Sequence, residues 1–220
     1  MRLALGISVT NEVDFLRRHL PILVPCFDGV YVCDGGSNDG SKEYIESFGN
    51  NVYLLQGDFG KGLDWKEANH KNSVVLEAEK SGYDWILSLD ADEVMFPRDI
   101  EVLKKYMTSE NNFLRIPRIE FYGDVNHFKP ALYPDFQGRA FRLNSGYHWR
   151  KDMHSIVYQG ENQLSCSEMG DVTNVPTTPI YHYGWAIALD KRMTRYYPGR
   201  ELPDYLHDPA IKVFYSRQPV

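Results

Sequence analysis

The chain of 220 residues contains no long apolar run, which excludes the most common type of membrane-spanning segment. A membrane-spanning helix needs roughly 20 consecutive, predominantly apolar residues, and no stretch approaches that length. The apolar residues Leu3–Val9 are too few for the apolar region of a secretory signal, and polar residues follow at once. We therefore expect no integral membrane segment.

Positive charge is also scarce, since 24 Lys and Arg stand against 30 Asp and Glu, for a formal net charge of −6. This balance excludes a nucleic-acid binder that relies on bulk positive charge, and we expect no nucleic-acid partner. Only three cysteines occur, namely Cys26, Cys33 and Cys166, without the spacing of a metal site. An odd number of unpaired thiols predicts a cytoplasmic protein, with peripheral attachment to a membrane left open.

The composition is that of a folded protein, with 43% hydrophobic and 25% charged residues, which excludes global disorder. Aromatic residues make up 14% and serve equally well in a core or on a stacking surface. We find no repeat and no linker. The sequence predicts a single domain over residues 1–220, made of the halves 1–107 and 108–220.

Strand and helix patterns alternate in the first half. The expected strands are the apolar runs Leu3–Val9, Val30–Cys33, Val52–Leu55 and Trp85–Leu89. The expected helices are Glu12–Leu20, which we expect Pro21 to end, Ser41–Phe48, Trp65–Lys80 and Asp99–Met107. This alternation predicts an α/β fold with a mainly parallel central sheet, flanked by helices on both faces.

The second half lacks this alternation of strand and helix patterns. Its sequence predicts a smaller region with antiparallel strands. Phe113–Ile116 and Ile119–Tyr122 are expected to pair with each other as antiparallel strands. The segment Gly123–Pro179 is expected to be rich in loops, followed by a strand at Ile180–Trp185 and a helix at Leu189–Tyr196.

Polar side chains follow three of the expected parallel strands. They are Thr10, Asn11 and Glu12 after the first strand, Asp34 after the second, and Asp90, Ala91 and Asp92 after the fourth. Ligands of open α/β sheets bind outside the carboxyl ends of the strands, so these residues are expected to converge on one crevice.

Asp90 and Asp92 flank one small residue, so an extended backbone points both carboxylates the same way. Two such carboxylates suit a hard divalent cation that also holds phosphate oxygens. The alternative is a turn or a helix cap, where aspartate is common. The position directly after a buried strand favours the cation.

Five segments together resemble family 2 of the inverting glycosyltransferases, which have the GT-A fold, and within it the small bacterial lipopolysaccharide-core glucosyltransferases. The segments are Ile7–Glu12, Val32–Ser41, Leu87–Glu93, Tyr133–Arg142 and Tyr181–Trp185. The resemblance spans about residues 3–190 and rests on the order and spacing of the segments. It implies a Rossmann-like, mainly parallel sheet with a smaller antiparallel region on the acceptor side.

The resemblance also implies roles for the polar residues. Thr10, Asn11, Glu12 and Asp34 would bind the nucleoside, Asp90 and Ala91 the ribose or sugar, and Asp92 and His182 the metal, Mn²⁺ or Mg²⁺. Asp135 would be the general base that inversion requires, with Asp152 as the reserve candidate. Two basic residues extend the donor site: Arg139 as a donor to the diphosphate, and Lys66, beside the glycine-rich segment 57–62, as part of a loop over the sugar.

Each assignment has a structural alternative. Asp34 is also typical of an Asx-turn, and Asp135 of a turn that follows proline. His182 is equally consistent with a structural histidine, Arg139 with a charged face in solvent, and Lys66 with an ordinary surface loop. The family's second acidic residue after Asp34 is replaced here by Gly35.

The resulting hypothesis is a metal-dependent, inverting transfer of a sugar from a nucleotide sugar, most simply a UDP sugar, to a hydroxyl of a glycan or glycoconjugate. The alternative is a nucleotide-sugar-binding or glycan-binding module without catalysis. Replacing Asp135 or His182 separates the two, because either change abolishes transfer in an enzyme but leaves the glycan affinity of a binding module largely intact.

Overall fold

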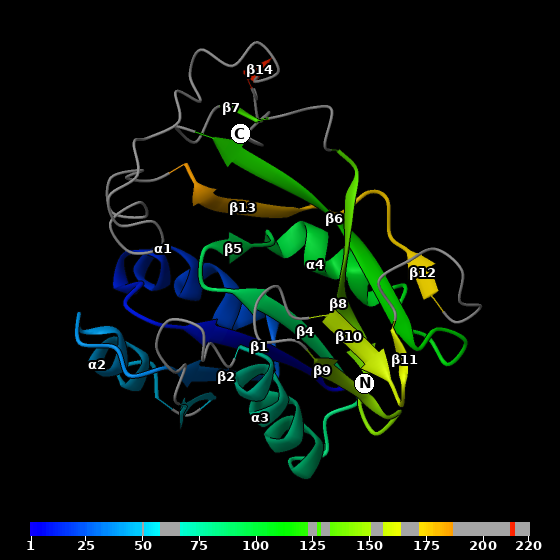
Figure 1. Ribbon diagram of the computed structural model, residues 1–220, viewed down its shortest axis with the longest axis horizontal. Coiled ribbons are helices and arrows are strands. Elements are labelled where there is room, and N and C mark those ends of the chain that lie inside the picture. The colour runs from blue at the N-terminus through cyan, green and yellow to red at the C-terminus, as the bar shows by residue number, and fades with distance from the viewer. Residues whose placement is uncertain are drawn as a thin grey trace.

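The computed structural model describes residues 1–49, 51–57, 67–122, 127–128, 133–150, 156–163, 172–186 and 212–213 (Figure 1). Its helices are α1 (Val13–Leu23), α2 (Ser41–Glu46), α3 (Glu67–Lys80) and α4 (Pro97–Lys104), with a 3₁₀ turn at Val24–Cys26. The strands of the first half are β1 (Leu3–Val9), β2 (Gly29–Asp34), β3 (Val52–Gln56), β4 (Trp85–Asp90) and β5 (Glu93–Val94). Those of the second half are β6 (Phe113–Tyr122), β7 (His127–Phe128), β8 (Asp135–Arg142), β9 (Tyr147–Arg150), β10 (Ile156–Gln159), β11 (Asn162–Gln163), β12 (Val172–Asn174), β13 (Ile180–Trp185) and β14 (Lys212–Val213). None of the helices in the described ranges is long and apolar enough to cross a membrane.

One large sheet runs through both halves in the order β14-β7-β6-β8-β4-β1-β2-β3. The four strands β3, β2, β1 and β4 are parallel, as the alternation of strands and helices predicted. Strand β8 joins β4 in the antiparallel sense, and β6 pairs antiparallel with β8. A second, small sheet has the order β11-β10-β9.

Both faces of the parallel strands are covered, so the predicted α/β layering is confirmed. In β1 the side chains of Leu3 and Leu5 pack on one face with α1 and α4, whereas Ala4 packs on the other with α3 and β9. A strand buried on both faces favours apolar residues at successive positions, which explains the nearly continuous apolar run of β1, where Ser8 is the one polar residue.

Helix α1 does not end at Pro21, as we expected, but continues to Leu23. Proline removes one backbone donor from a helix, and here the loss falls within the last turn. Leu20 and Leu23, on either side of the proline, are both fully buried in the core. Burial of these two side chains offsets the missing hydrogen bond.

The expectation of two paired strands between Phe113 and Tyr122 is wrong, because β6 is one strand. One edge of β6 pairs with β8 from Phe113 to Arg118, and the other edge pairs first with β12 and then with β13. Pro117 falls in the gap between the residues paired with β12 and those paired with β13, which is where a strand tolerates proline.

The expectation of a loop-rich segment from Gly123 to Pro179 is wrong in its described parts, where β8, β9, β10 and β12 lie. Asp135, Gln137 and Arg139 alternate along β8 and so share one face of the strand. That face is polar but only partly exposed. The sequence of this segment therefore lacks the apolar periodicity by which strands are predicted, and it resembles that of a loop. The predicted helix at Leu189–Tyr196 lies outside the described residues.

Gly6 allows α3 to pack closely against β1. A Cβ atom at this position would lie 2.6 Å from Cγ1 of Val74, a β-branched side chain with little rotamer freedom. We expect Gly6→Ala to lower the free energy of unfolding by about 1–3 kcal/mol, the usual cost of overpacking a core, as measured by urea denaturation. Adding Val74→Ala makes room for the new methyl group, so the double variant should be more stable than the sum of the two single effects predicts; additive effects would contradict this packing.

Candidate functional site

The polar strand ends meet at one edge of the sheet. Val9 pairs with Asp34 on one side of β1, and Ser8 pairs with Asp90 on the other. The two aspartates therefore flank the end of β1, as the strand-end rule predicted.

The segment after β1 is bonded directly to the loop after β2. Asn11 has a left-handed backbone with φ of 54°, a region that asparagine tolerates better than most residues. Its backbone N–H donates to Ser37 Oγ at 2.8 Å, and its Oδ1 accepts from the backbone N–H of Asn38 at 2.8 Å. Thr10 Oγ1 donates to the Val9 carbonyl, and the Glu12 carbonyl accepts the first hydrogen bonds of α1.

Asp34 is fully buried and organises the loop that follows it. Its carboxylate accepts hydrogen bonds from the backbone N–H groups of Gly36 and Ser37, at 3.2 and 3.0 Å, and from the Ser37 hydroxyl. This arrangement is the Asx-turn that was the structural alternative for Asp34. Contact of Asp34 with a nucleoside stays a prediction.

The Asp90 carboxylate is held by two cations, one on each oxygen. Lys71 Nζ lies 3.0 Å from Oδ1, and Arg139 Nη2 lies 3.1 Å from Oδ2. Burial alone would raise the pKa of Asp90, but Lys71 and Arg139 outweigh it and hold that pKa well below its ordinary value. Asp90 is therefore ionised, and 32% of its side chain remains exposed.

Glu93 completes this group from β5. It is buried, and its Oε1 lies 2.7 Å from Arg139 Nη2 while its Oε2 accepts the backbone N–H of Asp90 at 3.0 Å. Burial raises the pKa of Glu93 in spite of the attraction of Arg139. Arg139 is thus shared by two carboxylates rather than solvated, and its Nε has no hydrogen-bond partner among the described residues.

Arg118 connects Asp135 to the interior of the site. Its Nε and Nη2 donate to Asp135 Oδ2 at 3.1 and 2.8 Å, and Nη2 also lies 2.7 Å from Glu120 Oε1. The register of the sheet explains the first contact, because Arg118 of β6 stands opposite Asp135 of β8. Gln137 donates to the other Asp135 oxygen at 2.7 Å.

His182 lies between two carboxylates. In the register of the sheet it stands beside Glu93 of β5 and Glu120 of β6. Its Nε2 is 3.3 Å from Asp92 Oδ2, and its Nδ1 is 3.3 Å from Glu120 Oε1. Burial would lower the pKa of His182, but Asp92 and then Glu120 raise it to about 10.

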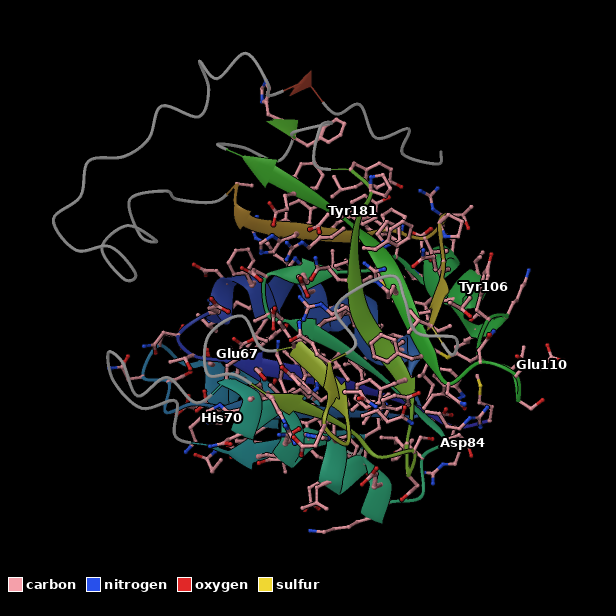
Figure 2. All side chains as sticks on the ribbon, turned by 45° about the vertical axis from the view of Figure 1, so that its right-hand side comes forward. Glu67, His70, Asp84, Tyr106, Glu110 and Tyr181 are labelled. Carbon is pink, nitrogen blue, oxygen red and sulfur yellow. The ribbon has the colours of Figure 1, made fainter. Side chains whose placement is uncertain are left out.

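These contacts join five of the predicted site residues, namely Asp90, Asp92, Asp135, Arg139 and His182, into one chain of alternating charge. It runs through Glu67, Lys71, Asp90, Arg139, Glu93, Arg118, Glu120, His182 and Asp92, with Asp135 attached at Arg118. Figure 2 labels Glu67 at the start of α3 and Tyr181, next to His182, on β13. The Ala91 carbonyl accepts from Nδ1 of the buried His19 at 2.8 Å, and Lys66 lies outside the described residues.

Within the described ranges, no group of three His, Cys, Asp or Glu side chains is arranged to hold a metal ion by itself. Asp92 Oδ2 and His182 Nε2 nevertheless lie side by side at 3.3 Å. Neighbouring ligands of an octahedral ion are about 3 Å apart when each bond is about 2.1 Å. Mg²⁺-type sites use one or two protein ligands and complete the shell with substrate phosphates and water. The two side chains therefore fit a metal ion shared with a diphosphate.

Five residues of this network escaped the sequence analysis as functional residues: Glu67, Lys71, Glu93, Arg118 and Glu120. Lys71 carried one usable signal, since it follows Glu67 by four residues and is a lysine on the buried side of α3. The other three are paired across strands whose register the sequence does not reveal.

The profile described as Glycosyl transferase family 2 matches residues 7–161, more than half of the chain. Among solved structures, the chain is similar to residues 1–349 of S. aureus TarS, with 12% identity over 83% of this chain and a TM-score of 0.56. It is also similar to a longer S. aureus TarS structure, with 12% identity over 83% of this chain and a TM-score of 0.57. The chain covers 60% and 36% of those two structures. Among proteins of curated function, none matches the sequence at a significant level.

Proposed function

The chain belongs to glycosyl transferase family 2 and is a glycosyltransferase with the GT-A fold, and from this premise we propose a metal-dependent, inverting transfer from a nucleotide sugar. The donor we favour is a UDP sugar, and the acceptor is a hydroxyl of a glycan or glycoconjugate. The observation that carries the proposal is the contact of Asp92, two residues after Asp90 at the end of β4, with His182 of β13.

The donor site in this proposal lies along the ends of β1, β2 and β4. The nucleoside lies against Thr10–Glu12 and the loop that Asp34 organises, where the two segments are bonded to each other. Asp90 accepts hydrogen bonds from hydroxyl groups of the ribose or the sugar, because an ionised carboxylate is an acceptor only. Arg139 remains the proposed donor to the diphosphate, on the side of the site where it also contacts Asp90 and Glu93. Lys66 and Ala91 remain proposed contacts of the donor.

Asp92 and His182 would hold the metal ion, Mn²⁺ or Mg²⁺. When bound, such an ion neutralises the charge that develops on the leaving nucleoside diphosphate. Glu120 faces the other nitrogen of His182, at 3.3 Å. Attraction between this carboxylate and the imidazole ring favours the ring orientation in which Nε2 faces Asp92.

Asp135 is the proposed general base. It takes the proton of the acceptor hydroxyl while the acceptor oxygen bonds to the anomeric carbon. The bond from that carbon to the diphosphate oxygen breaks, and its electron pair leaves with the diphosphate, so one displacement inverts the configuration. Arg118 and Gln137 each hold one oxygen of Asp135 and thereby fix the direction in which the carboxylate points.

Titration calorimetry tests the donor site. We expect UDP or a UDP sugar to bind in the presence of Mn²⁺ and to bind at least tenfold more weakly when the metal is chelated, because metal and diphosphate share ligands. A panel of UDP and GDP sugars identifies the donor by its affinity. Absence of binding by every nucleotide, with and without metal, would contradict the proposal and leave glycan binding without catalysis as the better account.

A further inference from the structure

We propose that Lys71 is a positioning residue, which holds the Asp90 carboxylate in its donor-binding orientation from the opposite side to the ligand. This inference rests on the proposed function, in which Asp90 contacts the donor. It concerns a residue of α3, which lies beside the sheet rather than at the ends of its strands.

Lys71 is one of the most deeply buried charges of the described chain, with 3% of its side chain exposed. Its Nζ lies 2.6 Å from Glu67 Oε1, one turn earlier on α3, and 3.0 Å from Asp90 Oδ1. A buried ammonium group is stable only when it is paired, and these two carboxylates provide the pairing. Because the side chain is enclosed, Lys71 acts on a ligand through Asp90.

The surroundings of Lys71 restrict its movement. Its Nζ lies 4.7 Å from the centre of the Trp149 ring, within the range of a cation–π contact. The neighbouring Asn72 donates to the Trp149 carbonyl at 2.9 Å and accepts from the Trp149 backbone N–H at 2.7 Å. This pair of hydrogen bonds fixes α3 to β9, so the Trp149 ring keeps its position beside the Lys71 ammonium group. These contacts favour the position of Lys71 in which its ammonium group reaches Asp90.

Asp90 requires a cation on Oδ1 because the cation on its other oxygen is shared. Arg139 lies 3.1 Å from Asp90 Oδ2 but only 2.7 Å from Glu93 Oε1. Without Lys71, Arg139 would be the only cation within ion-pair distance of Asp90 among the described residues, and the carboxylate could rotate toward it. Lys71 thus determines which lone pairs Asp90 presents to a ligand.

A double-mutant cycle tests the inference through the Kd of the UDP–Mn²⁺ complex, measured by calorimetry. Lys71→Met removes the charge and keeps the packing against Trp149, and we expect it to weaken binding about tenfold. In an Asp90→Asn background the same change should weaken binding less than about twofold, because the carboxylate that Lys71 positions is no longer present. Lys80→Met removes an exposed ion pair to Glu77 of the same helix and serves as the matched control, expected to bind as the wild type does.

An equal loss in both backgrounds would overturn the inference, since Lys71 would then act on the ligand directly. No loss in the wild-type background would overturn it as well. Should Lys71→Met fail to fold, the double variant Lys71→Met/Asp90→Asn removes both charges and is compared with Asp90→Asn alone. The two should bind within about twofold of each other, and a larger loss in the double variant would contradict the inference.

Urea denaturation is measured on the four proteins of the cycle, namely the wild type, Lys71→Met, Asp90→Asn and the double variant. These measurements separate this inference from the proposed function. Coupling between Lys71 and Asp90 in stability, together with coupling in nucleotide affinity, supports positioning. Coupling in stability without coupling in affinity overturns it and leaves a structural ion pair. Failure of the wild type to bind any nucleotide refutes both the proposed function and the positioning role that depends on it.

Discussion

Asp92→Asn should reduce sugar transfer by about 10³-fold, because stabilisation of the leaving diphosphate by a metal is worth several kcal/mol. Asp92 Oδ2 lies 3.3 Å from His182 Nε2, so the substitution removes the anionic member of the pair that we assign to the metal. Asparagine has nearly the same shape and keeps one oxygen. The loss should therefore appear in metal-dependent affinity for UDP and in transfer, measured as release of UDP with acceptor present.

The matched control for this variant is Asp84→Asn. Asp84 directly precedes the amino end of β4, the strand whose carboxyl end leads to Asp92, and its side chain is half exposed. Figure 2 labels Asp84 and Glu67 in separate parts of the molecule. We expect the control to keep wild-type transfer and metal dependence. If Asp92→Asn retains both as well, the metal site lies elsewhere.

Asp135→Asn should lower kcat by about 10²–10⁴-fold while the affinity for the nucleotide changes little. An amide cannot accept the proton of the acceptor hydroxyl. The carboxylate of Asp135 contacts Arg118 and Gln137 rather than Asp90 or Asp92, so the change leaves the donor site in place. The measurement combines steady-state kinetics of transfer with calorimetry of UDP binding. Loss of turnover with retained binding is also the result that separates an enzyme from a binding module.

Asp152 provides the competing assignment for the base, although it lies outside the described residues. We expect Asp152→Asn to retain turnover within a few-fold of the wild type. The reverse pattern, with turnover lost in Asp152→Asn and kept in Asp135→Asn, would move the base to Asp152. The ion pair of Asp135 with Arg118 would then have a structural role.

The parallel half of the fold was predictable because its strands are buried on both faces. Apolar runs such as Leu3–Val9 can form few other structures, and the predicted strand agrees with β1 at both ends. Strand β8 was not predicted as a strand, because Asp135, Gln137 and Arg139 occupy one of its faces. Those side chains are paired with other side chains of the fold, and hydrophobic periodicity carries no information about such pairing.

The same distinction applies to the site. The convergence of Asp34 and Asp90 follows from a rule about parallel strands, which needs no knowledge of side-chain partners. The ion pairs of Arg118 and Glu120 depend on the register of β6 with β8 and β13, which is set by tertiary packing. The sequence therefore predicts which strand ends form the site but not the cations that hold its carboxylates.

The most direct test of the central claim, that Asp92 and His182 hold a metal ion shared with a nucleoside diphosphate, is EPR titration of Mn²⁺ into the wild-type protein with and without UDP. Free Mn²⁺ has a sharp spectrum that is lost on binding. The account predicts that UDP increases the affinity for Mn²⁺ by at least about tenfold, and that Asp92→Asn removes this increase. An affinity for Mn²⁺ that is the same with and without UDP, or that survives Asp92→Asn, would contradict the account.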